Sequence, residues 1–161
     1  MTRRYARAPR GERAYGSVPR NRGKNTTLLA SMSLEGMGAA MAVEGSTTAK
    51  VFEAYVEGFL APTLKPGQVV ILDNLGAHKG EKVKRLIESR AASVIFLPAY
   101  SPDFNPIEES FSKIKAILKK TAARTREALI EAIGRALGAV ARQDAWGWFA
   151  HCGYVDGDQP S

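Results

Sequence analysis

Two short stretches of the sequence place a carboxylate where a binding site commonly forms. In "VVILD", Asp73 follows four apolar residues, and in the stretch 97–115 Glu108 follows an Asn-Pro pair at the predicted start of a helix. An acid at the carboxyl end of a strand in an open α/β sheet lies at the edge where ligands usually bind. Mg²⁺ takes one or two carboxylates and completes its shell with water and phosphate oxygens. The two acids are therefore a candidate metal site, provided that the fold brings them together.

Each acid also has a purely structural explanation. A lone Asp after a strand is commonly a turn former or a helix cap. With Asn105 as N-cap and Pro106 as the first helical residue, Glu108 takes the third position and could reach back in a capping-box arrangement. Asp103 is interpreted as a turn former, and Glu109, about 100° further around the helix, as solvated. Taken singly, each acid fits these explanations well.

Polar residues beside the two acids are candidates for positioning a ligand, a water molecule or a phosphate at the site. His78 lies five residues after Asp73, and Asn74 is adjacent to it. Either could orient a ligand, a water molecule or a phosphate from behind the metal-binding acids, and we assign the same role to Asn105 beside the second acid. The alternative for His78 is packing at the entrance to a helix, and the sequence favours neither reading.

The elements before Asp73 follow from periodicity and turn residues. Residues 26–34 and 37–43, joined by Glu35-Gly36, predict a β-hairpin. Apolar residues recur at helical spacing after Gly45, so we expect a helix that ends before Pro62.

The elements around the two acids predict an α/β layer structure. Strands at 69–72 and 93–97, linked by a helix at 79–90, form a parallel pair, because a helical crossover joins parallel strands. Two amphipathic helices are predicted at 105–120 and 125–142. The aromatic tail is expected to pack back on the core through Trp146, Trp148, Phe149 and Tyr154.

Length and composition indicate one globular domain, since the chain has 161 residues, of which 45% are hydrophobic. The single cysteine, Cys152, excludes an internal disulfide framework. Met1 is followed by arginines instead of an apolar segment, so we expect no secretory signal and a cytoplasmic, nucleoid-associated protein. No apolar stretch is long enough to span a bilayer, and no membrane partner is expected.

The net charge of +7 is concentrated at the start of the chain. Residues 1–24 hold eight basic side chains and one acidic side chain, and the remainder is balanced. Such an arm suits a polyanion, because Lys and Arg neutralise phosphates and release counterions. The alternative is a solvated segment that only aids solubility. The predicted DNA-binding residues are those of this arm together with two lysines of the helix 105–120: Arg3, Arg4, Arg7, Arg10, Arg13, Arg20, Arg22, Lys24, Lys113 and Lys115.

Together, "VVILDNLGAHKG" and "FLPAYSPDFNPIEESFSKIK" resemble the second and third catalytic segments of DDE-type transposases, in the mariner-like branch found in bacterial insertion sequences. The 34 residues between Asp73 and Glu108 are the spacing that this branch has between its second and third acids. The resemblance covers residues 2–154 and implies a ribonuclease H-like fold, with a mixed sheet flanked by helices. It also implies that Asp73 and Glu108 are catalytic metal ligands in a site of three acids and two ions, Mg²⁺ or Mn²⁺.

The function implied by this resemblance is DNA transposition. The family cleaves DNA strands and transfers them with divalent metal ions, without a covalent protein intermediate. The expected partners are DNA, as transposon ends and target, and a second copy of the chain as a homodimer in the transposition complex.

The sequence departs from the family pattern at its start. That pattern begins with a strand that ends in the first catalytic Asp, whereas residues 1–24 contain no apolar strand and no Asp. The segment resembles the one that follows the first acid, so we expect the first strand and the first metal ligand to be missing and the chain to be incomplete. We divide it into a basic arm (1–24), a catalytic domain (25–154) and a tail (155–161).

Two functions stay open from the sequence. The first is the catalytic domain of an insertion-sequence transposase, with the activity of this chain alone left undecided because the first acid is missing. The second is a non-catalytic, basic DNA-binding remnant of such an enzyme. An unrelated α/β metal-dependent hydrolase is a third reading, which the paired motifs disfavour.

Overall fold

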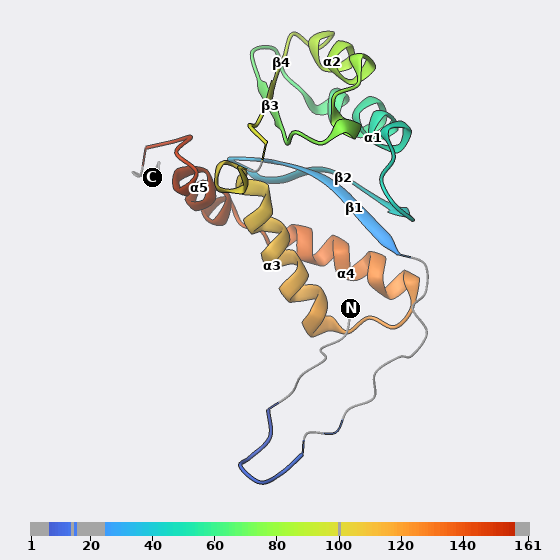
Figure 1. The fold of residues 1–161 in the computed structure, drawn as a ribbon, viewed down its shortest axis with the longest axis vertical. Coiled ribbons are helices and arrows are strands. Elements are labelled where there is room, and N and C mark those ends of the chain that lie inside the picture. The colour runs from blue at the N-terminus through green and yellow to red at the C-terminus, as the bar shows by residue number, and fades with distance from the viewer. Residues whose placement is uncertain (1–6, 14, 16–24, 100, 157–161) are drawn as a thin grey trace.

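The computed structural model describes residues 7–13, 15, 25–99 and 101–156. Its strands are β1 (Thr26–Ser33), β2 (Gly36–Glu44), β3 (Val69–Leu72) and β4 (Ser93–Phe96). Its α-helices are α1 (Ala49–Tyr55), α2 (Glu81–Glu88), α3 (Pro106–Thr121), α4 (Arg126–Gly138) and α5 (Arg142–His151). The β1–β2 hairpin runs through the middle of the fold, with α1, α2, β3 and β4 on one side and α3, α4 and α5 on the other (Figure 1).

The predicted hairpin is confirmed, and its strands carry apolar side chains on both faces. β1 and β2 are antiparallel, with Leu29 opposite Met41. These two residues pack on the core beside α1, whereas Leu28 packs on the core between α3 and α4. The turn lies one residue earlier than predicted, because Gly36 already pairs with Ser33. Gly36 has a φ of 115°, which side-chain-bearing residues rarely adopt.

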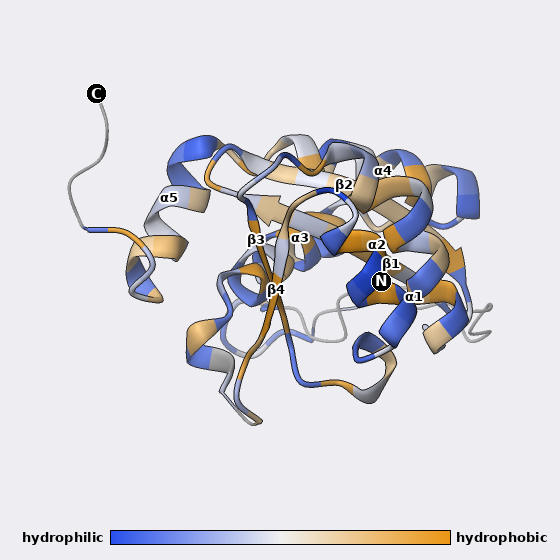
Figure 2. Cartoon of the chain, turned by 90° about the horizontal axis from the view of Figure 1, so that it is seen from above, coloured by the Kyte–Doolittle hydropathy of each residue, from blue (hydrophilic) through white to orange (hydrophobic). Residues whose placement is uncertain are grey.

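The predicted parallel pair is also confirmed. β3 and β4 run parallel and in register, from Val69 opposite Ser93 to Leu72 opposite Phe96. A mixed sheet needs an antiparallel and a parallel pair, and both are present, but within the described residues they form two separate two-stranded sheets. Figure 2 shows how apolar β3 and β4 are, and Val69 and Ile95 are 51% and 53% exposed. One face of this pair is therefore uncovered in the described part of the chain.

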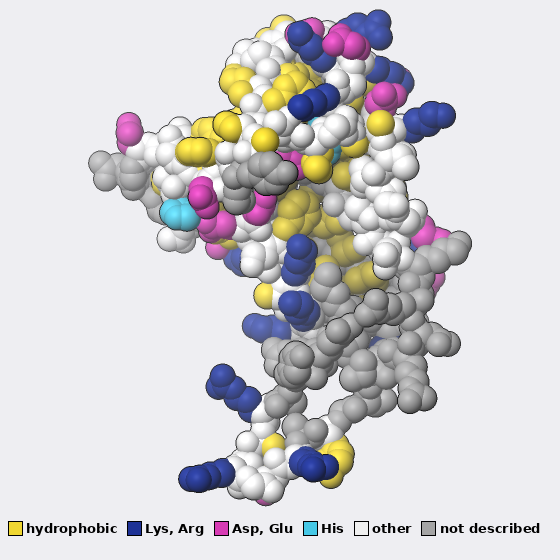
Figure 3. All heavy atoms as spheres, in the orientation of Figure 1, with side chains coloured by type: hydrophobic (Ala, Val, Ile, Leu, Met, Phe, Trp, Pro, Cys, Tyr) yellow, Lys and Arg dark blue, Asp and Glu magenta, His cyan; other side chains and the backbone are white. Residues whose placement is uncertain are grey.

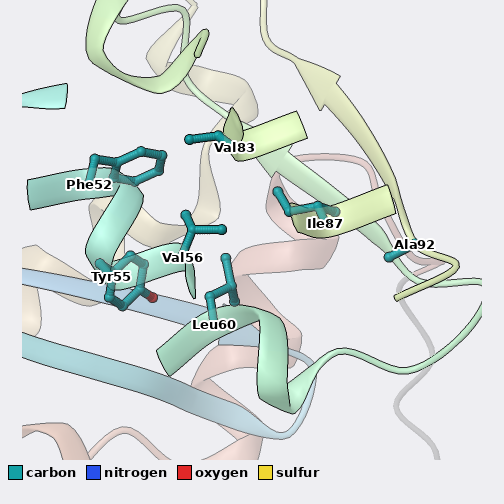
Figure 4. Packing of buried hydrophobic residues seen from close by; sticks show 7 residues of the cluster. All are labelled: Phe52, Tyr55, Val56, Leu60, Val83, Ile87 and Ala92. Atoms are coloured by element: carbon teal, nitrogen blue, oxygen red, sulfur yellow. The ribbon is translucent and has the colours of Figure 1, made fainter. Parts of the chain in front are cut away.

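The first core forms where the helix predicted after Gly45 meets α2 (Figure 4). α1 begins after Thr48, whose side chain accepts a hydrogen bond from the Val51 N–H, and it continues as a π-helical segment at Val56–Leu60 and a 3₁₀ turn at Ala61–Thr63. Helical structure thus passes Pro62 instead of ending before it. The buried residues of this core come from α1, the π-helical segment, α2 and the residue before β4: Phe52, Tyr55, Val56, Leu60, Val83, Ile87 and Ala92.

The second core lies between α3 and α4, and a helix that the sequence interpretation missed packs beside it. The sequence predicted one helix at 125–142, followed by a tail that contains the aromatic residues. In the structure, α4 ends at Gly138 and a separate helix, α5, spans Arg142–His151. Asp144 caps the start of α5, because its Oδ2 atom accepts a hydrogen bond from the Ala141 N–H at 2.8 Å. Of the four aromatic residues predicted to pack on the core, Trp148 packs on this one, whereas Tyr154 is 37% exposed, so the prediction is confirmed only in part. No helix in the described ranges is both long and apolar enough to cross a membrane.

Candidate catalytic and metal-binding site

Asp73 leaves the carboxyl end of β3, as predicted. The Leu97 N–H donates to the Leu72 carbonyl at 2.8 Å and continues the strand pairing to this point. The Asp73 Oδ1 atom accepts the Leu75 N–H at 3.4 Å, so the turn-forming role is real, and the same atom contacts Nδ1 of His78. These contacts use one carboxylate oxygen only, and in the described structure Oδ2 stays available for a further ligand.

The surroundings of His78 support its packing role and also bring it against Asp73. It ends the 3₁₀ turn Gly76–His78, and its side chain is 15% exposed. Its ring stacks on Phe52, with the centroids 4.0 Å apart and the planes at 29°. The histidine therefore packs on the core and contacts Asp73 at the same time. Asn74, the other neighbour of Asp73, is half-buried.

Glu108 lies in the first turn of α3, where Asn105 is the N-cap and Pro106 the first residue, as predicted. The Glu108 N–H donates to the Asn105 carbonyl at 3.1 Å. The Asn105 side chain makes no capping hydrogen bond, so the predicted capping-box arrangement is not formed. The Glu108 residue is exposed. Helix capping therefore does not occupy this carboxylate.

An open pocket of about 280 Å³ lies beside Glu108. Its other lining residues come from the turn before α3, the first turns of α3 and the end of α5: Asp103, Asn105, Glu109, Ser112, His151 and Cys152. The Glu109 side chain is 41% exposed, in line with its predicted contact with solvent, and its Oε1 atom also lies 2.7 Å from Nδ1 of His151. Asp103 is exposed in the 3₁₀ turn Pro102–Phe104.

The electrostatic character of this pocket is negative. Burial raises the pKa of the Cys152 thiol, and the charges of Glu109 and Asp103 raise it further. Sequence reasoning missed His151 and Cys152 as neighbours of Glu108. Their contact depends on α5 returning to α3, and no local pattern in the sequence indicates that return.

The ligand chemistry of the two acids fits a hard divalent ion. Asp73 has an available oxygen and Glu108 an exposed carboxylate, and both are oxygen donors of the kind that Mg²⁺ and Mn²⁺ prefer. Within residues 7–13, 15, 25–99 and 101–156, no group of three or more His, Cys, Asp or Glu side chains is arranged to hold a metal ion.

The residues predicted to bind DNA have different surroundings. Lys113 donates to Oδ2 of Asp144 at 2.5 Å, so its charge is already paired, whereas Lys115 is exposed. Arg7, Arg10 and Arg13 are exposed as well. Figure 3 shows basic side chains along α3 and on the N-terminal segment. The remaining predicted residues lie outside the described part of the chain: Arg3, Arg4, Arg20, Arg22 and Lys24.

Comparison with solved structures identifies the fold. The Mos1 strand transfer complex superposes with a TM-score of 0.74 at 20% identity, over 93% of this chain and 46% of that chain. The Mos1 mariner paired end complex with Mn gives 0.71 at 17% identity, over 94% and 48%. A pre-cleavage Mos1 transpososome gives 0.71 at 18% identity, over 99% and 52%. The chain thus spans about half the length of these proteins, and the predicted ribonuclease H-like fold is confirmed.

Comparison of the sequence with protein families gives one assignment. No curated protein matches the chain. The profile of the family described as DDE superfamily endonuclease matches residues 1–130, which is most of the chain and includes both acids. The resemblance drawn from the two motifs is confirmed by this match, and the chain belongs to the DDE superfamily endonuclease family.

Proposed function

We propose that this chain is the catalytic domain of a mariner-like insertion-sequence transposase, which cleaves and transfers DNA strands with the help of divalent metal ions. The observation that carries the proposal is the placement of the two acids. Asp73 ends β3 and Glu108 opens α3, each with carboxylate oxygen to spare, inside a chain that belongs to a family of endonucleases.

In this proposal Asp73 and Glu108 hold Mg²⁺ or Mn²⁺, with two ions in the complete site. When bound, such ions activate the attacking hydroxyl and stabilise the leaving oxygen of an in-line phosphodiester displacement. The chain itself supplies orientation. His78 holds one oxygen of Asp73 and leaves the other for the metal, while Asn74 and Asn105 orient water or phosphate oxygens nearby. Manganese is named in the description of one similar Mos1 complex, which is compatible with this ligand set.

DNA is the proposed substrate, as transposon ends and as target. The similar structures are described as Mos1 strand transfer and paired end complexes, which concern the two ends of an element. In this chain we assign phosphate contacts to the arm and to Lys115; of these, Lys115 and the described arm residues Arg7, Arg10 and Arg13 are exposed, whereas Lys113 is paired with Asp144. A homodimer in the transposition complex and a cytoplasmic, nucleoid-associated location complete the proposal.

The test is nicking of a supercoiled plasmid that carries the DNA flanking the coding sequence. We expect nicking with Mg²⁺ or Mn²⁺ and none with a chelator. Asp73→Asn and Glu108→Gln should abolish it, because each removes a metal ligand while conserving shape. Matched controls are Asp156→Asn and Glu127→Gln, two exposed acids outside the proposed site, which should nick like the wild type. Equal nicking by all four variants would overturn the proposal.

A non-catalytic DNA-binding domain is the second candidate. It is favoured by one observation, that the described residues contain no group of three side chains able to hold a metal ion. This candidate predicts salt-dependent DNA binding without cleavage under every metal condition. It also predicts that Asp73→Asn and Glu108→Gln leave DNA affinity unchanged, whereas a metal-bridged catalytic complex would lose metal-dependent affinity in both.

A further inference from the structure

α5 packs across the first half of α3 (Figure 1) and is bonded to it at two points. Near the start of α5, Asp144 accepts a hydrogen bond from Lys113 at 2.5 Å. At the end of α5, Nδ1 of His151 lies 2.7 Å from Oε1 of Glu109. The two contacts involve positions four residues apart on α3 and seven residues apart on α5, so α5 is held against α3 at two separate points.

The contacts continue past the helices to the turn that precedes α3. The Tyr154 hydroxyl donates to the Phe104 carbonyl at 2.7 Å, across 50 residues of sequence. The Phe149 ring meets the Tyr154 ring edge to face, with the centroids 5.9 Å apart, and so fixes the direction of the phenol. Phe104 is the last residue of the 3₁₀ turn that leads into the N-cap Asn105.

Glu108 is bracketed by these contacts. Phe104 lies four residues before it and Glu109 one residue after it, and both are bonded to the same C-terminal segment. Glu108 itself is exposed, and in the described structure its carboxylate makes no hydrogen bond or ion pair that would hold it in place. Its location therefore depends on the backbone of the turn and of the first helical turn, which the C-terminal segment holds.

We propose that α5 and residues 152–154 act as a splint for Glu108, in which Tyr154 and His151 are positioning residues for the metal-binding acid. The function of the splint rests on the metal role proposed above for Glu108. The segment lies beyond residue 130, where the family match ends, so the match itself does not assign it this role. Rigid support of ligand-bearing elements is what keeps a metal ligand within its narrow range of productive geometry.

The first experiment is hydrogen exchange of backbone amides, followed by mass spectrometry on the whole chain. Tyr154→Phe removes only the hydroxyl, and Tyr15→Phe, at a tyrosine that is 91% exposed, is the matched control. We expect exchange in residues 101–109 to become about tenfold faster in Tyr154→Phe, while peptides of α2 and α4 stay unchanged. An unchanged rate in 101–109, or a similar increase throughout the chain, would overturn the splint.

The second experiment measures Mn²⁺ affinity by electron paramagnetic resonance, which requires no DNA cleavage. Tyr154→Phe and His151→Ala should each weaken Mn²⁺ binding about threefold to tenfold. His151→Gln should restore most of the affinity, because its side-chain amide can still donate to Glu109. Loosening of 101–109 without any loss of Mn²⁺ affinity would contradict the link to Glu108.

The two proposals can fail separately. If Glu108→Gln binds Mn²⁺ as tightly as the wild type, the metal role of Glu108 is refuted, and with it the positioning role of the splint. Hydrogen exchange would still decide whether the C-terminal segment holds the turn, because that measurement involves neither metal nor DNA.

Discussion

Phe52 and His78 stack at a centroid distance of 4.0 Å, while the imidazole also contacts Asp73. Phe52 is itself 4% exposed and belongs to the core between α1 and α2. The candidate metal ligand at the end of β3 is thus connected to the hydrophobic core through one histidine and one phenylalanine. Substitutions in that core should therefore affect the position of Asp73 through Phe52 and His78.

Replacement of Phe52 by leucine should lower the free energy of unfolding by about 1 to 2 kcal/mol, because an aromatic contact and part of the buried area are lost. Phe96→Leu is the matched control, since Phe96 is 37% exposed in β4 and stacks on no other ring in the described structure, and it should change stability by no more than about 0.5 kcal/mol. Urea denaturation followed by circular dichroism measures both. Equal effects of the two substitutions would mean that the stacked pair adds no stability.

The two cores should unfold together. Ile87 in the first core and Ile114 in the second are 0% and 1% exposed, so Ile87→Ala and Ile114→Ala should each cost about 2 to 5 kcal/mol. β1 contributes Leu29 to one core and Leu28 to the other, which couples them through adjacent residues. We expect one cooperative transition with a lower midpoint in both variants. Two separate transitions in either variant would show that the cores are independent.

The pair of Lys113 and Asp144 should make stability depend on pH in the acid range. The hydrogen bond from Lys113, with a further one from the Ala141 N–H, lowers the pKa of Asp144 below its ordinary value of 3.8. A depressed carboxyl pKa stabilises the fold fully above about pH 4, and this contribution disappears as pH falls through the folded-state pKa. Asp144→Asn should therefore flatten the loss of stability below pH 4, as measured by urea denaturation. Asp156→Asn, at an exposed acid, should keep the wild-type profile.

Arm residues should contribute to the salt dependence of DNA binding. Arg7, Arg10 and Arg13 are exposed, so neutralising all three to glutamine should reduce the slope of log affinity against log salt by roughly 2 to 3. Lys84→Gln is a control, because Lys84 is exposed but lies 3.8 Å from Glu88. Fluorescence anisotropy with a labelled duplex measures the slopes. A slope identical to that of the wild type would remove this part of the arm from the DNA interface.

Local signals in the sequence predicted the features on which the site depends. Asp73 follows a short run of β-branched and apolar residues that favours a strand, and Asn105-Pro106 marks a helix start by its backbone preferences. Such patterns reach a few residues in each direction. They therefore located both acids on their elements, but they did not determine whether Glu108 would be used as a cap.

Long-range contacts could not be predicted from such local patterns. His151 meets Glu109 across 42 residues, and Tyr154 meets Phe104 across 50. α5 has no continuous apolar face, since Ala145 is its one fully buried residue, and so its periodicity does not resemble that of α3 or α4. The Glu109 side chain is 41% exposed, as the sequence suggested, but its contact with His151 was not predicted because α5 was not predicted.

The reactivity of Cys152 should report on the charge of the pocket beside Glu108. Burial raises the thiol pKa first, and the charges of Glu109 and Asp103 raise it further, so less thiolate is present at a given pH than in an unfolded chain. Iodoacetamide labelling at pH 8 should therefore be slower for the folded protein than for the protein in urea. Asp103→Asn should accelerate the folded-state reaction, because it removes a negative charge without breaking the contacts of α5. Asp103→Asn could instead label at the wild-type rate while urea still accelerates the reaction. Burial alone would then protect the thiol, and the acids of this pocket would have no effect on the formation of the Cys152 thiolate.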